Sequence, residues 1–512
     1  MTVRRLVLAV AGGALLFASH PPLDQPWAGY IALIPLLLLA RSCGVGGQPV
    51  RSGFGWGLVA GLVFFLPLVV WLNRFGAAAW LLLALLQSVF VGGFVAVVAA
   101  WRERTWRPLV AVAAWVGFEW LRSNVPLGGF PWGVLAYTQH GGGPVLPVAR
   151  VAGALGVSAV LAAVAACLEA LAVHLRRGER GRALLGPLGG AVGVVGVLLL
   201  VPPPPAPTSE VVDVAAVQGN DVDLPAFADR TDSDRIADIA DRMVAVTSRL
   251  ADDPSGAPQV VVWPENSLDV DPRGAPRIAA KIEQAQAFVG DAVLLAGTLL
   301  DGSQLRTFRN TIVRFGPGAE IVDVYDKRIL VPFGEYVPWR SVFGGLPPLR
   351  AIPNDGVPGD RAHAFDIDGV ATVGPVTCYE SLFPGLVRDQ VTAGAQVLVV
   401  STNNASFGRS PASRQHLTFS QLRAVETGRW VMHAGISGIS TVVDPRGGLS
   451  QRTELFEQAI VRADLPLVDA PTLYVRTGDV VGPVAAAATL AFVVGLAVAG
   501  LRSRRGSARA AS

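Results

Sequence analysis

Three residues in the second half of this 512-residue chain have the chemistry needed for nucleophilic catalysis. Cys378 comes directly after the predicted strand 370–377, Glu265 follows the predicted strand 259–263, and Lys327 follows a predicted hairpin. A thiol can act as nucleophile, a carboxylate as its general base, and an ammonium as the partner of an oxyanion. We therefore treat this set as a candidate catalytic triad.

Each member of the set also has a purely structural interpretation. Cys378 is either a reactive thiol, favoured as thiolate by a helix N-terminus and a nearby lysine, or a buried structural cysteine. Glu265 is either a partly desolvated base or an exposed loop carboxylate or helix cap, and Lys327 either stabilises an oxyanion or lies on the surface. Lysine is rare here, since Lys281 is the only other one among forty arginines, and the two cations are not interchangeable.

The remaining composition argues against a metal site, a cofactor and a nucleic-acid partner. The six histidines are scattered without zinc-ligand spacing, and the chain has neither a Walker loop nor a dinucleotide-binding glycine fingerprint. The net charge is only +3. Cys43 and Cys167 lie in the apolar half, so Cys378 has no cysteine partner within its own domain.

The apolar residues are concentrated in segments long enough to suggest membrane spans. The chain is 51% hydrophobic and 16% charged, against about 25% charged residues in soluble proteins. Apolar segments occur at 5–19, 28–41, 54–72, 77–100, 107–122, 150–174, 182–201 and 480–501. The first two are short for a bilayer, and the first is alternatively a cleaved signal peptide. The sequence thus predicts eight transmembrane helices.

Arginines predict the orientation of these spans. Fifteen arginines lie in alternate segments between the spans, whereas the intervening short segments contain only Arg74, Arg122 and Arg150. The positive-inside bias then places both termini in the cytoplasm and residues 202–479 outside it. A bacterial inner membrane is the expected location.

Two polar features lie within the apolar half. Glu119 and Glu169 fall near the ends of predicted spans, where a charge is either functional or reaches the interface by snorkelling, the interpretation we favour. The segment 123–148 is aromatic and rich in turns, which favours an interfacial loop with an aromatic belt over a loop shaping a lipid entrance.

The polar half alternates strand-like and helix-like segments, which is typical of a layered α/β domain. Strands are predicted at 211–217, 259–263, 292–300, 370–377, 396–401 and within 430–443, with a hairpin over 310–324, and helices at 230–250, 277–288, 384–392 and 413–427. The predicted division is a membrane domain at 1–201, a proline-rich linker at 202–209, a catalytic domain at 210–470, a return segment with the eighth helix at 471–501, and a basic tail at 502–512.

These motifs resemble a known family. Trp263-Pro264-Glu265, Lys327 and Cys378-Tyr379-Glu380 are similar to the Glu–Lys–Cys triad of the nitrilase superfamily. The flanking spans, together with Val-Pro-Phe-Gly-Glu-Tyr-Val-Pro at 331–338, resemble the apolipoprotein N-acyltransferases in particular. Further similar motifs lie at 217–220, 401–404, 415–416, 423–426 and 474–478.

The resemblance implies an αββα sandwich beside an eight-helix membrane bundle. It implies transfer of a fatty acyl chain from a phospholipid, typically phosphatidylethanolamine, to the N-terminal S-diacylglyceryl-cysteine of a lipoprotein. The matching positions make Cys378 the nucleophile, Glu265 the base and Lys327 the oxyanion partner. Supporting or substrate-binding positions are Glu335, Tyr379 and Glu380. One departure is Phe227, where the family has tryptophan, so an indole donor is absent at that position.

Two other functions fit parts of the sequence. A membrane-tethered amidase of the nitrilase type would use the same triad with water as acceptor, although eight spans exceed what tethering needs. A lipid-binding scaffold with a decayed site would not need a cysteine, a lysine and a glutamate all in place.

Overall fold

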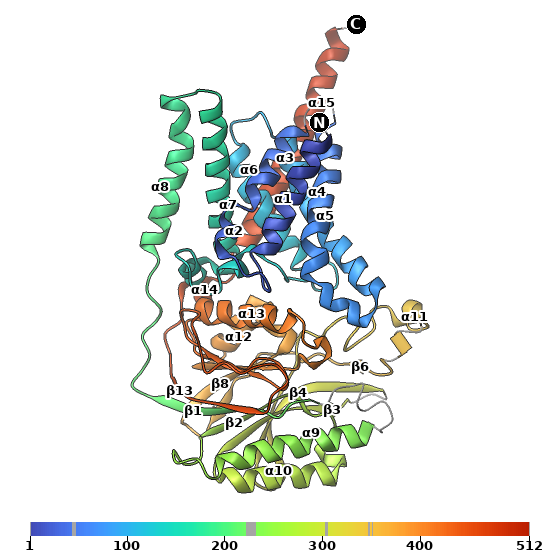
Figure 1. The fold of residues 1–512 in the computed structure, drawn as a ribbon, viewed down its shortest axis with the longest axis vertical. Coiled ribbons are helices and arrows are strands. Elements are labelled where there is room, and N and C mark those ends of the chain that lie inside the picture. The colour runs from blue at the N-terminus through green and yellow to red at the C-terminus, as the bar shows by residue number, and fades with distance from the viewer. Residues whose placement is uncertain are drawn as a thin grey trace. The chain divides into compact units, whose positions relative to one another are not determined.

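The fold consists of two compact units, described from a computed structural model (Figure 1). The structure describes residues 2–43, 48–221, 232–302, 306–346, 349–350 and 352–510. The helical unit comprises Met1–Pro203 and Thr477–Ser512, and the α/β unit comprises Pro204–Arg476. The predicted departure at Phe227 lies outside the described residues.

Apolar helices form the first unit. Its α-helices are α1 (Thr2–Ala18), α2 (Pro26–Ile31), α3 (Leu33–Ser42), α4 (Pro49–Leu68), α5 (Ala77–Ala100), α6 (Arg107–Arg122), α7 (Ala149–Arg176), α8 (Leu185–Leu200) and α15 (Val481–Ala510). Among the described helices, four are long and apolar enough to cross a membrane: Pro49–Leu68, Ala77–Ala100, Leu146–Arg176 and Val481–Val498. The other predicted spans are helical but shorter, so eight crossings remain a prediction.

Glycines at a spacing of four bring α4 and α5 into backbone contact. A Cβ atom added at Gly57 would lie 2.9 Å from the Cα atom of Gly92, and one added at Gly61 would lie 2.7 Å from that of Ser88. Small residues at this spacing allow two membrane helices to pack closely. The helix pair therefore depends on residues without bulky side chains.

Both predicted span-end carboxylates are buried, so the snorkelling interpretation is wrong. Glu169 accepts hydrogen bonds from Arg41 Nε at 2.5 Å and Arg107 Nη1 at 2.8 Å, and its side chain is fully buried. Glu119 accepts a hydrogen bond from the Leu135 backbone N–H at 2.7 Å and lies 3.8 Å from Arg122. A charge inside an apolar bundle requires such partners.

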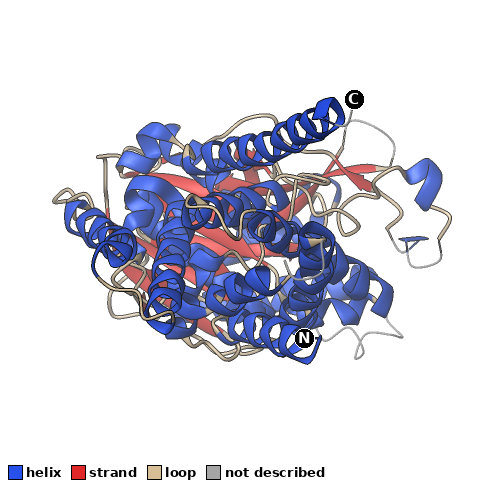
Figure 2. Ribbon diagram, turned by 90° about the horizontal axis from the view of Figure 1, so that it is seen from above, coloured by secondary structure: helices blue, strands red, loops and turns tan. Residues whose placement is uncertain are grey.

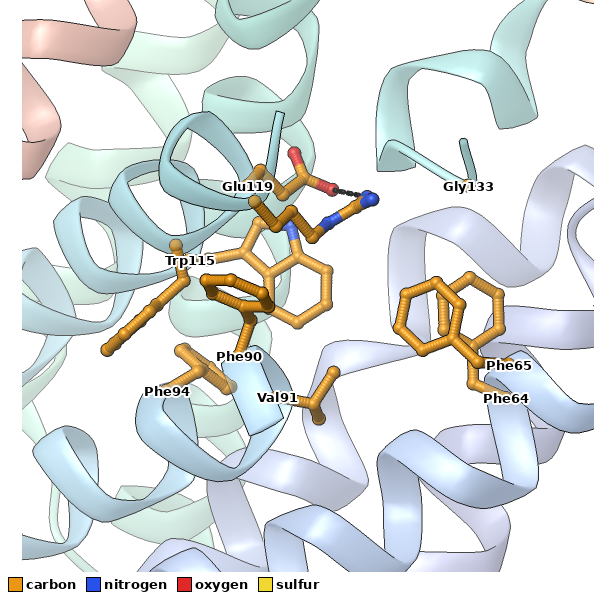
Figure 3. Close-up of a pocket in the computed structure, with 10 residues that line it drawn as sticks. Phe64, Phe65, Phe90, Val91, Phe94, Trp115, Glu119 and Gly133 are labelled. Atoms are coloured by element: carbon orange, nitrogen blue, oxygen red, sulfur yellow. Dashed lines mark ion pairs between the residues drawn. The ribbon is translucent and has the colours of Figure 1, made fainter. Parts of the chain in front are cut away.

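The segment 123–148 is also less exposed than an aromatic belt would be. Trp132 is buried, and Arg122 Nη1 donates to its carbonyl at 2.7 Å. Figure 3 shows a neighbouring pocket of the helical unit, where Phe64, Phe65 and the rings around them gather beside Glu119. Its lining is aromatic apart from the Glu119–Arg122 pair, so the interior here is largely apolar.

All described strands belong to the α/β unit (Figure 2). One sheet has the order β13-β1-β2-β3-β4-β5, with β6 beside β4, and the other has the order β12-β11-β10-β9-β8-β7. The first contains β1 (Val211–Gln218), β2 (Val260–Leu268), β3 (Val293–Asp301), β4 (Thr307–Gly316), β5 (Glu320–Asp326), β6 (Asp355–Gly356) and β13 (Ala459–Pro466). The second contains β7 (Phe365–Ile367), β8 (Ala371–Thr377), β9 (Val397–Thr402), β10 (Val431–Gly435), β11 (Thr441–Val443) and β12 (Leu449–Ser450).

Side-chain alternation along the strands builds four layers. Val397 and Val399 of β9 join the core between the sheets, whereas Leu398 and Val400 join the core under the helices, because successive strand residues face opposite sides. Helices α9 (Asp232–Thr247) and α10 (Pro276–Val289) cover the first sheet, and α12 (Pro384–Thr392) and α13 (Ala412–Thr427) cover the second (Figure 1). The unit is therefore an αββα sandwich with a nitrilase-like α/β fold.

Two strand predictions need correction. Glu265 does not follow its strand but lies within β2, where the register with β3 shifts between Trp263 and Leu268. The sequence reading also missed β13, which pairs antiparallel with β1 along its whole length. Its alternation of apolar and charged residues is weak, so the long-range pairing with β1 specifies the strand.

Candidate active site

Cys378 stands at the end of β8 in a strained backbone conformation. It is the first residue of the 3₁₀ helix η10 (Cys378–Leu382), and its φ is +46°. Only a small left-handed region is open to residues with a side chain at positive φ. The residue is partly exposed. A strained residue at a strand end is a common arrangement at functional sites.

Glu265 reaches the same place from the first sheet. Its carboxylate accepts hydrogen bonds from the Asn403 backbone N–H at 3.0 Å and from the Cys378 thiol. A Cβ atom on Gly297 in the adjacent strand would lie 2.6 Å from the Glu265 Cα atom. Glycine at 297 thus permits the irregular course of β2 that carries the carboxylate to the thiol.

Lys327 follows β5 directly and is almost fully buried. Its Nζ atom lies 3.0 Å from Glu265 Oε1 and 2.9 Å from Glu335 Oε1. The Lys327 backbone N–H donates to the Asn310 carbonyl at 2.8 Å, which fixes the loop after the strand. The structure therefore brings together the carboxylate, the ammonium and the thiol.

The charges of the site assign its resting protonation state. Burial opposes the charge of Glu265, but the Lys327 ammonium and its hydrogen bonds outweigh burial and lower the pKa of Glu265 below its ordinary value. Burial likewise opposes the charge of Lys327, yet Glu265 and Glu335 hold its pKa well above the usual value. The resting pair is therefore a carboxylate and an ammonium.

The thiol differs from the expected thiolate. Desolvation and then the negative charge of Glu265 raise the pKa of Cys378, and the effect of Lys327 in the other direction is smaller. The expectation of a resting thiolate is therefore wrong, because Glu265 lies as close to the sulfur as the cation does. A protonated thiol beside an ionised carboxylate requires a general base for attack.

Glu335 and Asn310 complete the polar contacts of the pair. Asn310 Nδ2 donates to Glu265 Oε1 at 2.9 Å and to Glu335 Oε1 at 2.7 Å. The second oxygen of Glu335 accepts from the Val331 backbone N–H at 2.7 Å. Sequence reasoning missed Asn310, whose only signal is an amide inside an otherwise apolar stretch of β4.

Glu380 connects the loop of Lys327 to the turn of Cys378. Its buried carboxylate accepts from the backbone N–H groups of Arg328 at 2.6 Å and Thr377 at 2.8 Å, and from the Tyr325 hydroxyl at 3.0 Å. Burial raises the pKa of Glu380 to about 7, against the backbone hydrogen bonds that favour its charge. Glu380 therefore positions the two loops that carry the reactive groups.

Tyr379 lies beside the nucleophile and is half-buried. Its ring packs edge-to-face on Phe383, with ring centroids 5.2 Å apart. Burial raises the pKa of the Tyr379 hydroxyl, so the group stays protonated at neutral pH. The described residues contain no cluster of His, Cys, Asp and Glu that could hold a metal ion.

Comparison with known proteins places this site in a family context. The family profile described as "Apolipoprotein N-acyltransferase N-terminal domain" matches residues 12–167, and the profile described as "Carbon-nitrogen hydrolase" matches residues 214–472. Among solved structures, an amidase from Nesterenkonia sp. AN1 is 19% identical, has a TM-score of 0.36, and covers 52% of this chain and 95% of its own.

Similarity to named relatives extends over both units. The apolipoprotein N-acyltransferase of Mycolicibacterium smegmatis is 34% identical over 96% of this chain and 84% of its own length. That of Geobacter metallireducens is 30% identical over 96% of this chain and 95% of its own. The chain belongs to the apolipoprotein N-acyltransferase family.

Proposed function

We propose that this chain transfers a fatty acyl chain from a phospholipid to the N-terminal amine of a diacylglyceryl-cysteine lipoprotein, through a thioester on Cys378. The observation that carries the proposal is the joint contact of Glu265 with Lys327, 3.0 Å away, and with the Cys378 thiol. This arrangement supplies a nucleophile, a base and a cation in one place. Membership of the family, with named relatives over 96% of the chain, supports the substrate classes.

The first half-reaction forms the acyl-enzyme. Glu265 accepts the thiol proton as the Cys378 sulfur attacks the ester carbonyl of the phospholipid. Lys327 and a backbone N–H of the turn after Cys378 stabilise the oxyanion. The C–O bond of the ester then breaks, and the proton held by Glu265 passes to the departing lysophospholipid. Glu265 is ionised again at the end.

The second half-reaction forms the amide. The lipoprotein amine attacks the thioester, Glu265 removes a proton from the attacking nitrogen, and the same cation stabilises the second oxyanion. The C–S bond breaks, and the Cys378 sulfur recovers a proton from Glu265. An amide is more stable than a thioester, so this step runs forward.

Three further residues support this chemistry. Glu335 keeps Lys327 charged and in place through their 2.9 Å contact. Glu380 positions the loops of Lys327 and Cys378, and Tyr379 lies where it can contact the bound acyl donor. We assign no metal or cofactor to the reaction.

The test is mass spectrometry of a diacylated, cysteine-terminated lipopeptide incubated with the protein and phospholipid vesicles. The proposal predicts a mass gain of one acyl chain on the peptide amine, fastest with phosphatidylethanolamine, the donor we propose. Release of free fatty acid with unmodified peptide would instead indicate an amidase-like hydrolase.

We further propose that eight helices cross a bacterial inner membrane, with both termini in the cytoplasm and the catalytic domain, 210–470, outside it. The bias of fifteen arginines against three supports this orientation. The linker 202–209, the return segment 471–501 and the tail 502–512 complete the proposed division. A reporter fused after Pro207 should be active only outside the cytoplasm and one fused after Arg505 only inside, and reversed signals would overturn the orientation.

A further inference from the structure

A buried histidine lies directly behind the proposed nucleophile. His416, on α13, is 2% exposed. Its Nε2 atom lies 3.1 Å from the carbonyl oxygen of Cys378 and 2.9 Å from Ser381 Oγ. Its Nδ1 atom lies 3.1 Å from Asn404 Oδ1 and 3.3 Å from Thr402 Oγ1. The mechanism described above gives this imidazole no role.

The contacts of Nε2 determine where the ring carries its proton. A carbonyl oxygen only accepts, and the Ser381 hydroxyl donates its own proton to the same Cys378 carbonyl at 2.8 Å. Both neighbours of Nε2 therefore present lone pairs. The two contacts are favourable together only if Nε2 carries the proton and shares it between them.

The opposite side of the ring is consistent with this assignment. With the proton on Nε2, Nδ1 accepts from the Thr402 hydroxyl. The Asn404 amide nitrogen is buried without a partner among the described residues, and the two ends of a side-chain amide are interchangeable by a half-turn. Turned in this way, Asn404 donates to Nδ1 and its nitrogen gains an acceptor. Burial lowers the pKa of His416 to about 4, so the ring holds one proton at neutral pH.

The hydrogen bond acts on the strained residue of the site. Cys378 has a φ of +46°, a conformation that an L-residue adopts only when its surroundings hold it there. Its carbonyl is held by Ser381, two turns of contact away from solvent, and by His416 from the covering helix. The orientation of this peptide group sets the direction in which the Cys378 side chain points.

We propose that His416 is a positioning residue for acyl transfer: its Nε2–H group holds the Cys378 carbonyl and thereby directs the thiol toward Glu265. This inference rests on the proposed role of Cys378 as nucleophile. It assigns His416 no contact with substrate and no proton transfer to the reacting atoms.

The test compares three substitutions in the full-length protein. Glutamine places an amide donor near the position of Nε2, asparagine reaches only the position of Nδ1, and leucine fills volume without a donor. His416→Asn and His416→Leu should slow acylation of Cys378 by phospholipid about 100-fold, because a nucleophile displaced by an ångström reacts that much more slowly. His416→Gln should fold and stay within about tenfold of the parent rate.

The readout is the single-turnover rate of thioester formation at increasing phosphatidylethanolamine concentration, beside a thermal unfolding curve for each variant. The half-saturating lipid concentration should not change, since His416 does not contact the lipid. If leucine or asparagine matches the parent rate, or if glutamine fails to fold or is as slow as leucine, the proposal is overturned. If only glutamine folds, the role is structural and the proposal also fails.

Cys378→Ala is measured in the same assay to separate this inference from the proposed mechanism. A persistent acyl adduct in that variant would remove Cys378 as the nucleophile. Loss of the adduct in Cys378→Ala, with equal rates in the glutamine and leucine variants, would overturn the role of His416 alone.

Discussion

The helical unit and the α/β unit each bury a carboxylate among cations, with different partners. Glu169 in the helical unit accepts from the guanidinium groups of Arg41 and Arg107. Glu265 in the α/β unit contacts Lys327 at 3.0 Å and the Cys378 thiol. Guanidinium groups stay protonated in proteins, so Glu169 has no partner with which to exchange a proton. Glu265 has one.

The difference shows that burial of charge does not by itself identify a reactive site. A buried ion pair can serve only to join elements, as Glu169 joins α3, α6 and α7. A reactive site also needs a group that can lose its proton and a path from solvent. Cys378 supplies both, because its thiol is protonated at rest and the residue is partly exposed.

The largest effect should follow removal of the base. Glu265→Gln keeps the shape of the side chain but cannot accept the thiol proton, so acylation should slow about 1,000-fold, within the range known for general bases. Because the pKa of Glu265 lies below its ordinary value of 4.5, the parent rate should fall only as pH drops below that value. A pH–rate profile of single-turnover acylation checks both points. A parent rate that already falls between pH 7 and pH 5 would contradict the assignment.

Removal of the cation should have the next largest effect. Lys327→Met should slow both half-reactions about 100-fold, because each passes through an oxyanion. The matched control is Lys281→Met, since Lys281 is the other lysine of the chain and pairs with Asp241 outside the site. Acylation and deacylation rates are measured separately. Loss of only one half-reaction would show that Lys327 does not stabilise both oxyanions.

Loss of the Glu380 charge should have a smaller effect on the rate and a diagnostic effect on stability. Glu380→Gln removes an acceptor of backbone N–H groups and should slow acylation about tenfold through misplaced loops. The folded pKa of Glu380 is raised from 4.5 to about 7, so its contribution to stability is present below pH 4.5 and lost as pH rises through 7. Unfolding temperatures at pH 5 and pH 8 should therefore differ less in the variant than in the parent. An unchanged difference would remove Glu380 as its source.

The smallest effect on chemistry should come from the helical unit. Glu169→Gln leaves two buried guanidinium groups without a counter-charge, which should destabilise the fold by about 3 kcal/mol or more. The acylation rate per folded molecule should stay within about twofold of the parent, because Glu169 has no reactive partner. Thermal unfolding and an active-site titration measure the two quantities. A large loss of rate at unchanged stability would erase the distinction between the two units.

The sequence predicted the elements and reactive groups that local patterns encode. Alternating apolar residues located β8 and β9, and turn residues at 316–318 located the hairpin of β4 and β5. The motifs around Glu265, Lys327 and Cys378 identified groups that the structure brings together. Each of these features depends on a few neighbouring residues.

Features that depend on distant partners could not be predicted in this way. Burial of Glu169 requires Arg41 and Arg107, which lie 128 and 62 residues away along the chain. Asn310 and His416 acquire their positions only when separate strands and a covering helix meet. The protonated state of the Cys378 thiol likewise depends on the distance of Glu265 from the sulfur, which no local pattern specifies.

The central claim, that Cys378 carries the acyl chain, is tested most directly by mass spectrometry of the protein after incubation with phosphatidylethanolamine alone. The account predicts an acyl adduct on Cys378 that hydroxylamine removes, release of one lysophospholipid per adduct, and no adduct in Cys378→Ala. The adduct should then transfer to a lipopeptide added without further phospholipid. Absence of any adduct, with full transfer once both substrates are present, would show direct transfer in a ternary complex and contradict the account.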